Sequence, residues 1–154
     1  MKWVSKDIET YLTAKEYVDT AVVPLYCVSF GNDMKQSASS AEFITLLTSY
    51  LERQFTGRLL LLPPFTYLKN ERPEETFLEV KKWEENIVKN EFKHIFYITS
   101  ESDWKLYEKD LSGSLIWIPS LPLEHLNDQQ KISMIESQVK QLLSLFTQKW
   151  YEKE

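Results

Sequence analysis

RLLLLPP, at residues 58–64, is the stretch that decides the fold. Four consecutive leucines between an arginine and two prolines predict a short strand whose side chains are buried on both faces. Strands of this kind belong to parallel sheets that helices cover on both sides. Pro63 and Pro64 also stand where a phosphate-binding protein would place glycines, so the stretch argues against a glycine-rich nucleotide loop.

Three other apolar runs predict further strands. Residues 20–30 are rich in valine, leucine, tyrosine and phenylalanine. Regular pairing is expected only from about Leu25, because Pro24 lacks the N–H of a ladder bond. The other two strands are expected at residues 94–99 and 115–118. Together with the leucine run, they give a sheet of four strands.

Helices are predicted between these strands because apolar residues recur there at intervals of three and four positions. Ser5 is expected to cap the first helix. Ser39 and Asn127 are each followed, three positions later, by a glutamate or glutamine, which is the pattern of a capping box. The predicted helices span residues 6–18, 39–57, 74–90, 104–108 and 127–150.

The alternation of strands and helices predicts a three-layer α/β/α fold with a mostly parallel four-stranded sheet. Its topology is expected to be flavodoxin- or Rossmann-like without a glycine-rich loop, and the simplest strand order is 2-1-3-4. A length of 154 residues suits one α/β domain, which is predicted to span residues 1–154.

The charge and the cysteine content limit which partners and which cellular compartment are expected. The 18 lysines and arginines against 23 aspartates and glutamates give a net charge of −5, which disfavours nucleic acid and anionic membranes as partners. The single cysteine, Cys27, excludes an intramolecular disulfide and fits a reducing compartment. Residues 1–7 lack the apolar core of a secretory signal, and no apolar run reaches the roughly 20 residues of a membrane span. A cytoplasmic location is therefore expected.

The candidate functional residues follow the predicted strands, because the ligand crevice of an open parallel sheet lies outside the carboxyl ends of its strands. Asp33, Glu101 and His125 could serve as an acid, a base and an orienting group if the fold brings them within hydrogen-bonding reach. Polar residues are equally expected in such loops as turn, cap or surface residues. The candidates for ligand binding are Ser29, Asn32, Thr66, Tyr67, Ser100, Asp103 and Ser120.

Several well-defined chemistries are not indicated. Neither His94 nor His125 has a cysteine or a second histidine at metal-ligand spacing, so no metal site is expected. With three glycines, the chain has no glycine-rich phosphate loop and no esterase nucleophile elbow, and no cofactor is expected. Cys27 is either a thiolate nucleophile or a small core residue, and its apolar strand favours the second interpretation.

Five tryptophans are many for a chain of this length. Trp117 alternates with isoleucines in a predicted strand and is expected in the core. Trp104 follows an acidic turn and Trp150 ends the last helix, so the exposure of these two residues stays open. Exposed tryptophan would indicate a surface for a partner protein.

Two sets of segments resemble known families. Residues 28–33, followed by the helix that contains Phe43 and Leu47, are similar to the Toll/interleukin-receptor class. That resemblance implies a domain that assembles with its own kind, and in some members NAD cleavage, but no catalytic glutamate motif follows in the later helix. Met1–Trp3 and Ala14–Leu25 resemble the uncharacterised YpiF-type family of Bacillus-like bacteria, and the resemblance extends over the whole chain. It implies a bacterial cytoplasmic setting and brings no activity, cofactor or catalytic residue with it.

Two functions follow as hypotheses. The leading one is a non-enzymatic protein-interaction or regulatory domain, because catalytic signatures are missing and aromatic residues are abundant. Its partner would be another protein or a second copy of the chain. The alternative is a small enzyme or ligand-binding protein that holds a nucleotide- or sugar-type metabolite in the loops at the carboxyl ends of the strands. An enzyme of this kind depends on Asp33, Glu101 and His125 lying close together.

Overall fold

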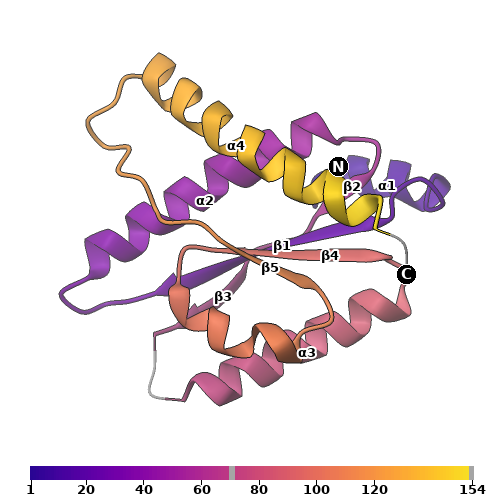
Figure 1. The fold of residues 1–154 in the computed structure, drawn as a ribbon, viewed down its shortest axis with the longest axis horizontal. Coiled ribbons are helices and arrows are strands. Elements are labelled where there is room, and N and C mark those ends of the chain that lie inside the picture. The colour runs from indigo at the N-terminus through magenta and orange to yellow at the C-terminus, as the bar shows by residue number, and fades with distance from the viewer. Residues whose placement is uncertain (70–71, 153–154) are drawn as a thin grey trace.

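The computed structural model describes residues 1–69 and 72–152 and has the predicted three-layer α/β/α architecture (Figure 1). Its helices are α1 (Ser5–Thr13), α2 (Met34–Gln54), α3 (Pro73–Lys89), the 3₁₀ helix η1 (Ser102–Asp110) and α4 (Asp128–Trp150). Its strands are β1 (Thr20–Val28), β2 (Leu59–Leu61), β3 (Phe65–Leu68), β4 (His94–Thr99) and β5 (Ser114–Trp117).

The strand order is β2-β1-β4-β5, with every pair parallel, which confirms the order predicted for the four expected strands. A fifth strand, β3, was not predicted. It pairs with β1 on the same side as β2, so the two prolines between β2 and β3 interrupt an edge strand instead of ending it. Val22 of β1 pairs with Leu61 of β2, and Leu25 of β1 pairs with Phe65 of β3. The edge strand therefore uses four residues where β1 uses three. The extra residue makes this interruption a bulge.

Pro24 is accommodated inside β1 by that same interruption. The expectation that pairing begins near Leu25 is wrong, because β1 pairs with both neighbours from Thr20 onward. The backbone groups of Thr20 and Val22 bond to the β2 segment, and that of Val28 bonds to the residue after β3. Backbone groups in a parallel strand alternate between its two neighbours, so the nitrogen of Pro24 faces the same side, opposite the two prolines. The missing N–H falls where the ladder is already broken.

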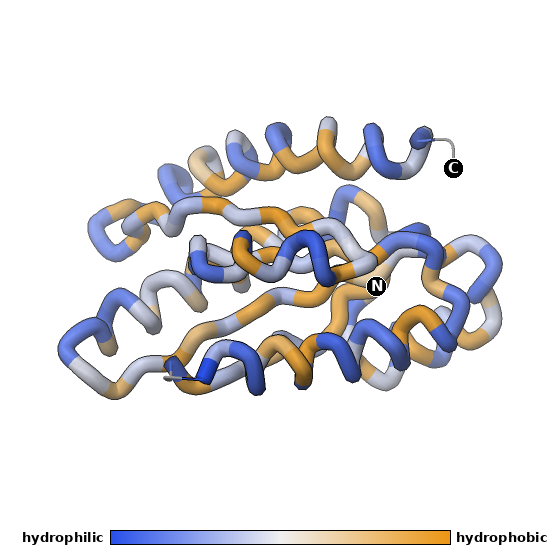
Figure 2. The backbone as a smooth tube through the Cα atoms, turned by 60° about the horizontal axis from the view of Figure 1, so that its bottom comes forward, coloured by the Kyte–Doolittle hydropathy of each residue, from blue (hydrophilic) through white to orange (hydrophobic). Residues whose placement is uncertain are grey.

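Two apolar layers hold helices against the sheet. Helices α2 and α4 cover one face, and their cluster includes Phe43, Leu47 and Phe146 around Phe96 of β4. Helices α3 and α1, with η1, cover the other face, where Tyr97 of β4 belongs to the second cluster. Figure 2 shows the apolar residues concentrated along the strands and the inner sides of the helices.

Helix ends agree with the sequence prediction where a side-chain cap is present. Asn127 and Gln130 form the predicted capping box of α4, with bonds of 2.8 and 3.0 Å. Ser39 caps no helix, because α2 already begins at Met34. Helix α1 ends at Thr13, short of the predicted residue 18, and Ser5 lies inside it without a capping bond. Helix α2 also ends at Gln54, before the predicted residue 57, and η1 extends beyond the predicted residues 104–108 at both ends.

The buried carboxylate of Glu84 fastens α3 to the turn before β5. Its side chain accepts hydrogen bonds from the Tyr97 hydroxyl at 2.7 Å and from Lys81 Nζ at 3.0 Å. It also accepts bonds from the backbone N–H groups of Ser112 at 2.9 Å and Gly113 at 3.1 Å. Burial alone would raise the pKa of Glu84, but these hydrogen bonds outweigh burial and hold the pKa below its ordinary value.

Gly113 lies too close to β4 to carry a side chain. A Cβ at this position would stand 2.8 Å from the Ile95 carbonyl oxygen and 2.8 Å from a ring carbon of Tyr97. We therefore expect Gly113→Ala to lower the free energy of unfolding by about 2 kcal/mol, because backbone atoms of β4 must move. Urea unfolding measures this change.

The matched control for that substitution is Gly57→Ala. Apart from its two chain neighbours, no described residue lies within 4 Å of a Cβ at position 57. Alanine there restricts the unfolded chain, so stability should stay unchanged or rise by about 0.5 kcal/mol. Equal losses in the two variants would contradict the close approach of Gly113 to β4.

Candidate functional site

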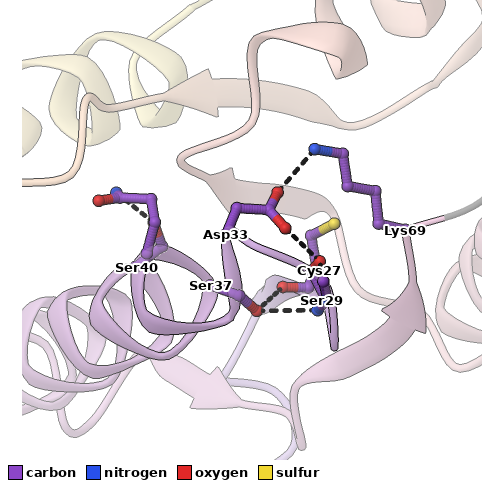
Figure 3. Close-up of polar contacts among 8 residues, drawn as sticks. Cys27, Ser29, Asp33, Ser37, Ser40 and Lys69 are labelled. Carbon is purple, nitrogen blue, oxygen red and sulfur yellow. Dashed lines mark hydrogen bonds and ion pairs between the residues drawn. The ribbon is translucent and has the colours of Figure 1, made fainter.

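The loops that follow β1, β3 and β4 meet at one end of the sheet, which we call the carboxyl edge. Asp33 joins two of these loops (Figure 3). Its carboxylate accepts a hydrogen bond from the Ser29 hydroxyl and one from Lys69 Nζ at 2.7 Å. The Lys69 ammonium, followed by the Ser29 hydroxyl, lowers the pKa of Asp33 to about 2. Asp33 and Lys69 therefore form an ion pair at neutral pH.

Ser37 fixes the end of β1 to the first turns of α2. Its hydroxyl donates to the Cys27 carbonyl oxygen at 2.8 Å and accepts from the Ser29 N–H at 3.0 Å. Figure 3 shows these bonds beside the ion pair of Asp33 and Lys69. Ser37 thus satisfies backbone groups that β1 leaves unpaired where it ends.

Aromatic side chains fill the centre of the carboxyl edge. The indole N–H of Trp104, a buried residue of η1, donates to the Tyr67 hydroxyl at 2.8 Å. That hydroxyl also lies within hydrogen-bonding reach of the Cys27 thiol. Burial raises the pKa of Tyr67 and of Cys27, and the nearby Glu101 carboxylate raises both further. Cys27 therefore stays protonated at neutral pH, as expected for a packed thiol and not for a nucleophile.

A small cavity, here called the edge pocket, remains beside these rings. Its volume is about 70 Å³. Metabolite sites usually measure about 300–1,000 Å³, so the edge pocket is too small for a nucleotide or a sugar. Its walls are formed by Cys27, Tyr67, Lys69, Pro73, Thr76, Glu101, Asp103, Trp104 and Tyr107.

The structure brings part of the predicted site together. Asp33 contacts Ser29, and Glu101 lies near Cys27 and Tyr67. His125 is apart, with a side chain that is 92% exposed and an ion contact of 4.0 Å to Glu124. Within residues 1–69 and 72–152, no hydrogen bond or ion pair links any two of Asp33, Glu101 and His125. Their joint use in catalysis stays a prediction.

The remaining candidates serve local roles or face solvent. Thr66 is exposed and donates to a proline carbonyl oxygen two residues earlier. The Ser100 hydroxyl is buried and has no hydrogen-bond partner among the described residues. Asp103 is exposed and lines the edge pocket, Asn32 is exposed, and Ser120 is half-buried. None of these residues adds a second catalytic arrangement within the described part of the chain.

The tryptophans divide between packing and surface. Trp117 was expected in the core, which is wrong: it is 37% exposed, and Lys105 Nζ lies 3.9 Å from its ring centroid. Its strand β5 is an outer strand of the sheet. Trp150 is half-buried, donates to the Thr20 hydroxyl at 2.7 Å and stacks under the Arg58 guanidinium at 4.1 Å. Trp150 is therefore a packing residue.

A larger opening, the α1–α3 groove, lies where α1, the β2 segment and α3 meet. Its volume is about 590 Å³. Trp3 and Leu12 project from the α1 side with more than half of their surface exposed, while the Tyr11 ring stacks on Phe92 at 5.7 Å. The groove is lined by Trp3, Tyr11, Leu12, Lys15, Leu60, Leu62, Pro63, Trp83, Asn86, Ile87, Asn90 and Phe92.

Sequence reasoning missed the α1–α3 groove because its lining comes from separate segments. The one available signal was α1 itself. Ile8 and Tyr11 on its inner side pack against the core, yet Leu12 and the preceding Val4 and Trp3 are also apolar and are more than half exposed. A short helix with apolar residues on two sides is typical of a surface that contacts another molecule.

Two further features concern metals and membranes. Among the described residues, no group of three histidine, cysteine, aspartate or glutamate side chains is placed to hold a metal ion. In the same part of the chain, no helix combines the length and the apolar character needed to cross a membrane.

Comparison with known proteins identifies the family. A family model described as a protein of unknown function, DUF2487, matches residues 9–150. The chain belongs to this family. It is 39% identical over 150 residues to the uncharacterized protein YpiF of Bacillus subtilis strain 168, an alignment that covers 97% of this chain and 98% of the relative. The resemblance to the YpiF-type family is thereby confirmed. No solved structure gives a match.

The DUF2487 match contains both surfaces described above. It includes the whole carboxyl edge and every residue of the α1–α3 groove except Trp3. Neither description names an activity, so the geometry of these two surfaces carries the functional proposal.

Proposed function

We propose that this chain is a non-enzymatic protein-interaction domain that binds a partner protein in the α1–α3 groove. The observation that carries the proposal is the exposed apolar lining of this groove, with Trp3 and Leu12 projecting beside it. Tryptophan is one of the side chains enriched at the energetic centres of protein interfaces. Burying it and Leu12 against a partner removes apolar surface from water.

The groove suits a short apolar segment of the partner. Its polar lining is limited to Lys15, Asn86 and Asn90. The amide groups of Asn86 and Asn90 donate to backbone carbonyls of α3, so their side-chain oxygens are left to accept hydrogen bonds from a partner's backbone. Apolar walls with a few polar groups are the usual composition of a peptide-binding groove.

The small size of the edge pocket argues against metabolite binding at the carboxyl edge. The α1–α3 groove is about 590 Å³, whereas the edge pocket is about 70 Å³. A nucleotide or sugar needs more room than the edge pocket offers. The carboxyl edge also holds no linked acid, base and orienting group among the described residues, which argues against an enzyme.

We expect Leu12→Asp to weaken partner binding at least about tenfold, because it places a charge in the apolar contact. Leu106→Asp on η1 is the matched control, since Leu106 is 80% exposed and lies outside the groove. The tagged wild-type chain and both variants are compared by quantitative affinity capture from a lysate of the native cells. A protein retained by the wild type and by Leu106→Asp but lost with Leu12→Asp supports the proposal.

Two outcomes would overturn it. Equal retention of every captured protein by Leu12→Asp and the wild type would remove the groove from the interaction. Light scattering after size exclusion identifies the other outcome: a wild-type dimer that Leu12→Asp dissociates would assign the groove to a second copy of this chain. Leu12 is 57% exposed, so thermal melting should show both variants folded.

A further inference from the structure

We propose that the edge pocket binds an alkylammonium group, either of a free amine or of a lysine side chain. This site is distinct from the α1–α3 groove and does not depend on the function proposed for it. Three properties of the pocket lead to this ligand: the aromatic rings in its wall, the negative net charge of the groups around it, and its volume.

The rings of Tyr67, Trp104 and Tyr107 stand at large angles to one another around the pocket. The Tyr67 and Trp104 planes meet at 82° with 5.6 Å between centroids, and the Trp104 and Tyr107 planes meet at 64° with 6.3 Å between centroids. All three residues line the pocket, and one face of the Tyr107 ring is covered by the Phe77 ring, with 4.8 Å between centroids. Aromatic faces carry negative potential and attract cations, which is how aromatic cages recognise ammonium groups.

The charged groups in and beside the pocket carry a negative net charge. Glu101 and Asp103 line it, and within the described residues neither carboxylate makes a hydrogen bond or an ion pair. Lys69 is the cation in the wall, and its ammonium is held by the Asp33 carboxylate at 2.7 Å. Cys27 and Tyr67 are uncharged at neutral pH because burial raises the pKa of both groups. The Lys69 ammonium also interacts electrostatically with Glu101, but the three carboxylates of Asp33, Glu101 and Asp103 outnumber this one ammonium.

The amino terminus of α3 disfavours a cation in the pocket. Pro73 and Thr76, which line the pocket, belong to the first turns of this helix. A helix amino terminus carries about half a positive elementary charge. Glu74 in the same first turn offsets it, whereas Glu75 is paired with Arg72 at 3.2 Å. The sum of these groups with Glu101 and Asp103 is negative, so the pocket disfavours phosphate and carboxylate ligands.

The volume limits how large the cation is. About 70 Å³ accommodates an ammonium with a few carbon atoms and excludes a nucleotide. A bare metal ion is not expected, because no group of three suitable ligands exists among residues 1–69 and 72–152. An alkylammonium group uses both the apolar ring faces and the carboxylates.

The indole N–H resonance of Trp104 reports on the pocket, because this group donates to the Tyr67 hydroxyl. The Trp150 indole, which donates to Thr20 at the other end of β1, is the internal control. In ¹⁵N-labelled protein, with the Trp104 signal assigned from Trp104→Phe, we expect ethylammonium or tetramethylammonium to shift Trp104 saturably and to leave Trp150 unchanged. Uncharged tert-butanol should bind at least about tenfold more weakly than tetramethylammonium.

Charge variants test the role of the carboxylate. Glu101→Gln should weaken ammonium binding roughly tenfold, while Glu108→Gln, an exposed change outside the pocket on the 3₁₀ helix that follows Glu101, should leave it unchanged. The dissociation constants of ethylammonium and of a lysine-containing peptide distinguish the two sources of the alkylammonium group. Tighter binding of ethylammonium indicates a free amine, and tighter binding of the peptide indicates a lysine side chain. Absence of a saturable Trp104 shift, equal binding of tert-butanol, equal affinity of Glu101→Gln, or a preference for acetate or phosphate would each overturn the proposal.

Discussion

Glu84→Ala is expected to lower the free energy of unfolding by about 4 kcal/mol, a large fraction of the stability of a chain of this size. The carboxylate is 2% exposed and accepts four hydrogen bonds, from groups on α3, β4 and the turn before β5. Its removal leaves the fully buried Tyr97 hydroxyl and two backbone N–H groups without their acceptor. Urea unfolding followed by circular dichroism measures the loss.

Two companion variants separate the contributions at position 84. Glu84→Gln keeps one acceptor oxygen and should lose about 2 kcal/mol. Glu85→Ala, an exposed change at the next position of α3, should alter stability by no more than about 0.5 kcal/mol. Equal unfolding midpoints for Glu84→Ala and Glu85→Ala would show that the buried network does not stabilise the fold.

The same carboxylate gives stability a defined pH dependence. The pKa of Glu84 is lower in the folded chain than its ordinary value of 4.5. The unfolded state therefore takes up the proton first, and the contribution is complete above pH 4.5 and is lost as the pH falls through the folded pKa. The stability advantage of the wild type over Glu84→Gln should accordingly shrink in acid. An advantage that grew below pH 4.5 would contradict this sign.

Phe146→Ala is expected to lower the free energy of unfolding by about 4 kcal/mol, because it leaves a cavity in the apolar core between α4 and the sheet. The Phe146 ring is fully buried, stacks on Phe96 at 3.8 Å and lies 6.1 Å from the ring of Phe55. Leu145→Ala is the matched control, since Leu145 is the preceding residue of α4 and is 45% exposed. Similar unfolding free energies for the two variants would contradict the burial of Phe146 in the core.

Much of the fold was predictable because burial imposes a strong pattern on the sequence. The leucine run and residues 94–99 lie in strands buried on both faces, and the predicted bounds of β4 agree with the structure. The capping box at Asn127 was predictable because both of its bonds are local. Strand β3 was not predicted, because two prolines normally end pairing, and here a bulge opposite Pro24 lets pairing resume.

The candidate site was less predictable, because its contacts join distant segments. Parallel topology placed Ser29 and Asp33 at the carboxyl edge, as expected from their position after β1. Lys69, the partner of Asp33, is 36 residues away and follows the strand that was not predicted. The filling of the crevice by Trp104 and Tyr67 depends on side-chain packing, which no local sequence pattern specifies.

Photo-crosslinking at Leu12 tests the central claim, the α1–α3 groove as a protein-binding surface, most directly. The photoreactive amino acid benzoyl-phenylalanine is placed at position 12 or, as the control, at the 80% exposed position of Leu106, and adducts formed in native cells are identified by mass spectrometry. We predict an adduct with one partner protein from position 12, absent from position 106 and reduced by Trp3→Ala. Identical adduct patterns from the two positions, or adducts only with further copies of this chain, would contradict the claim.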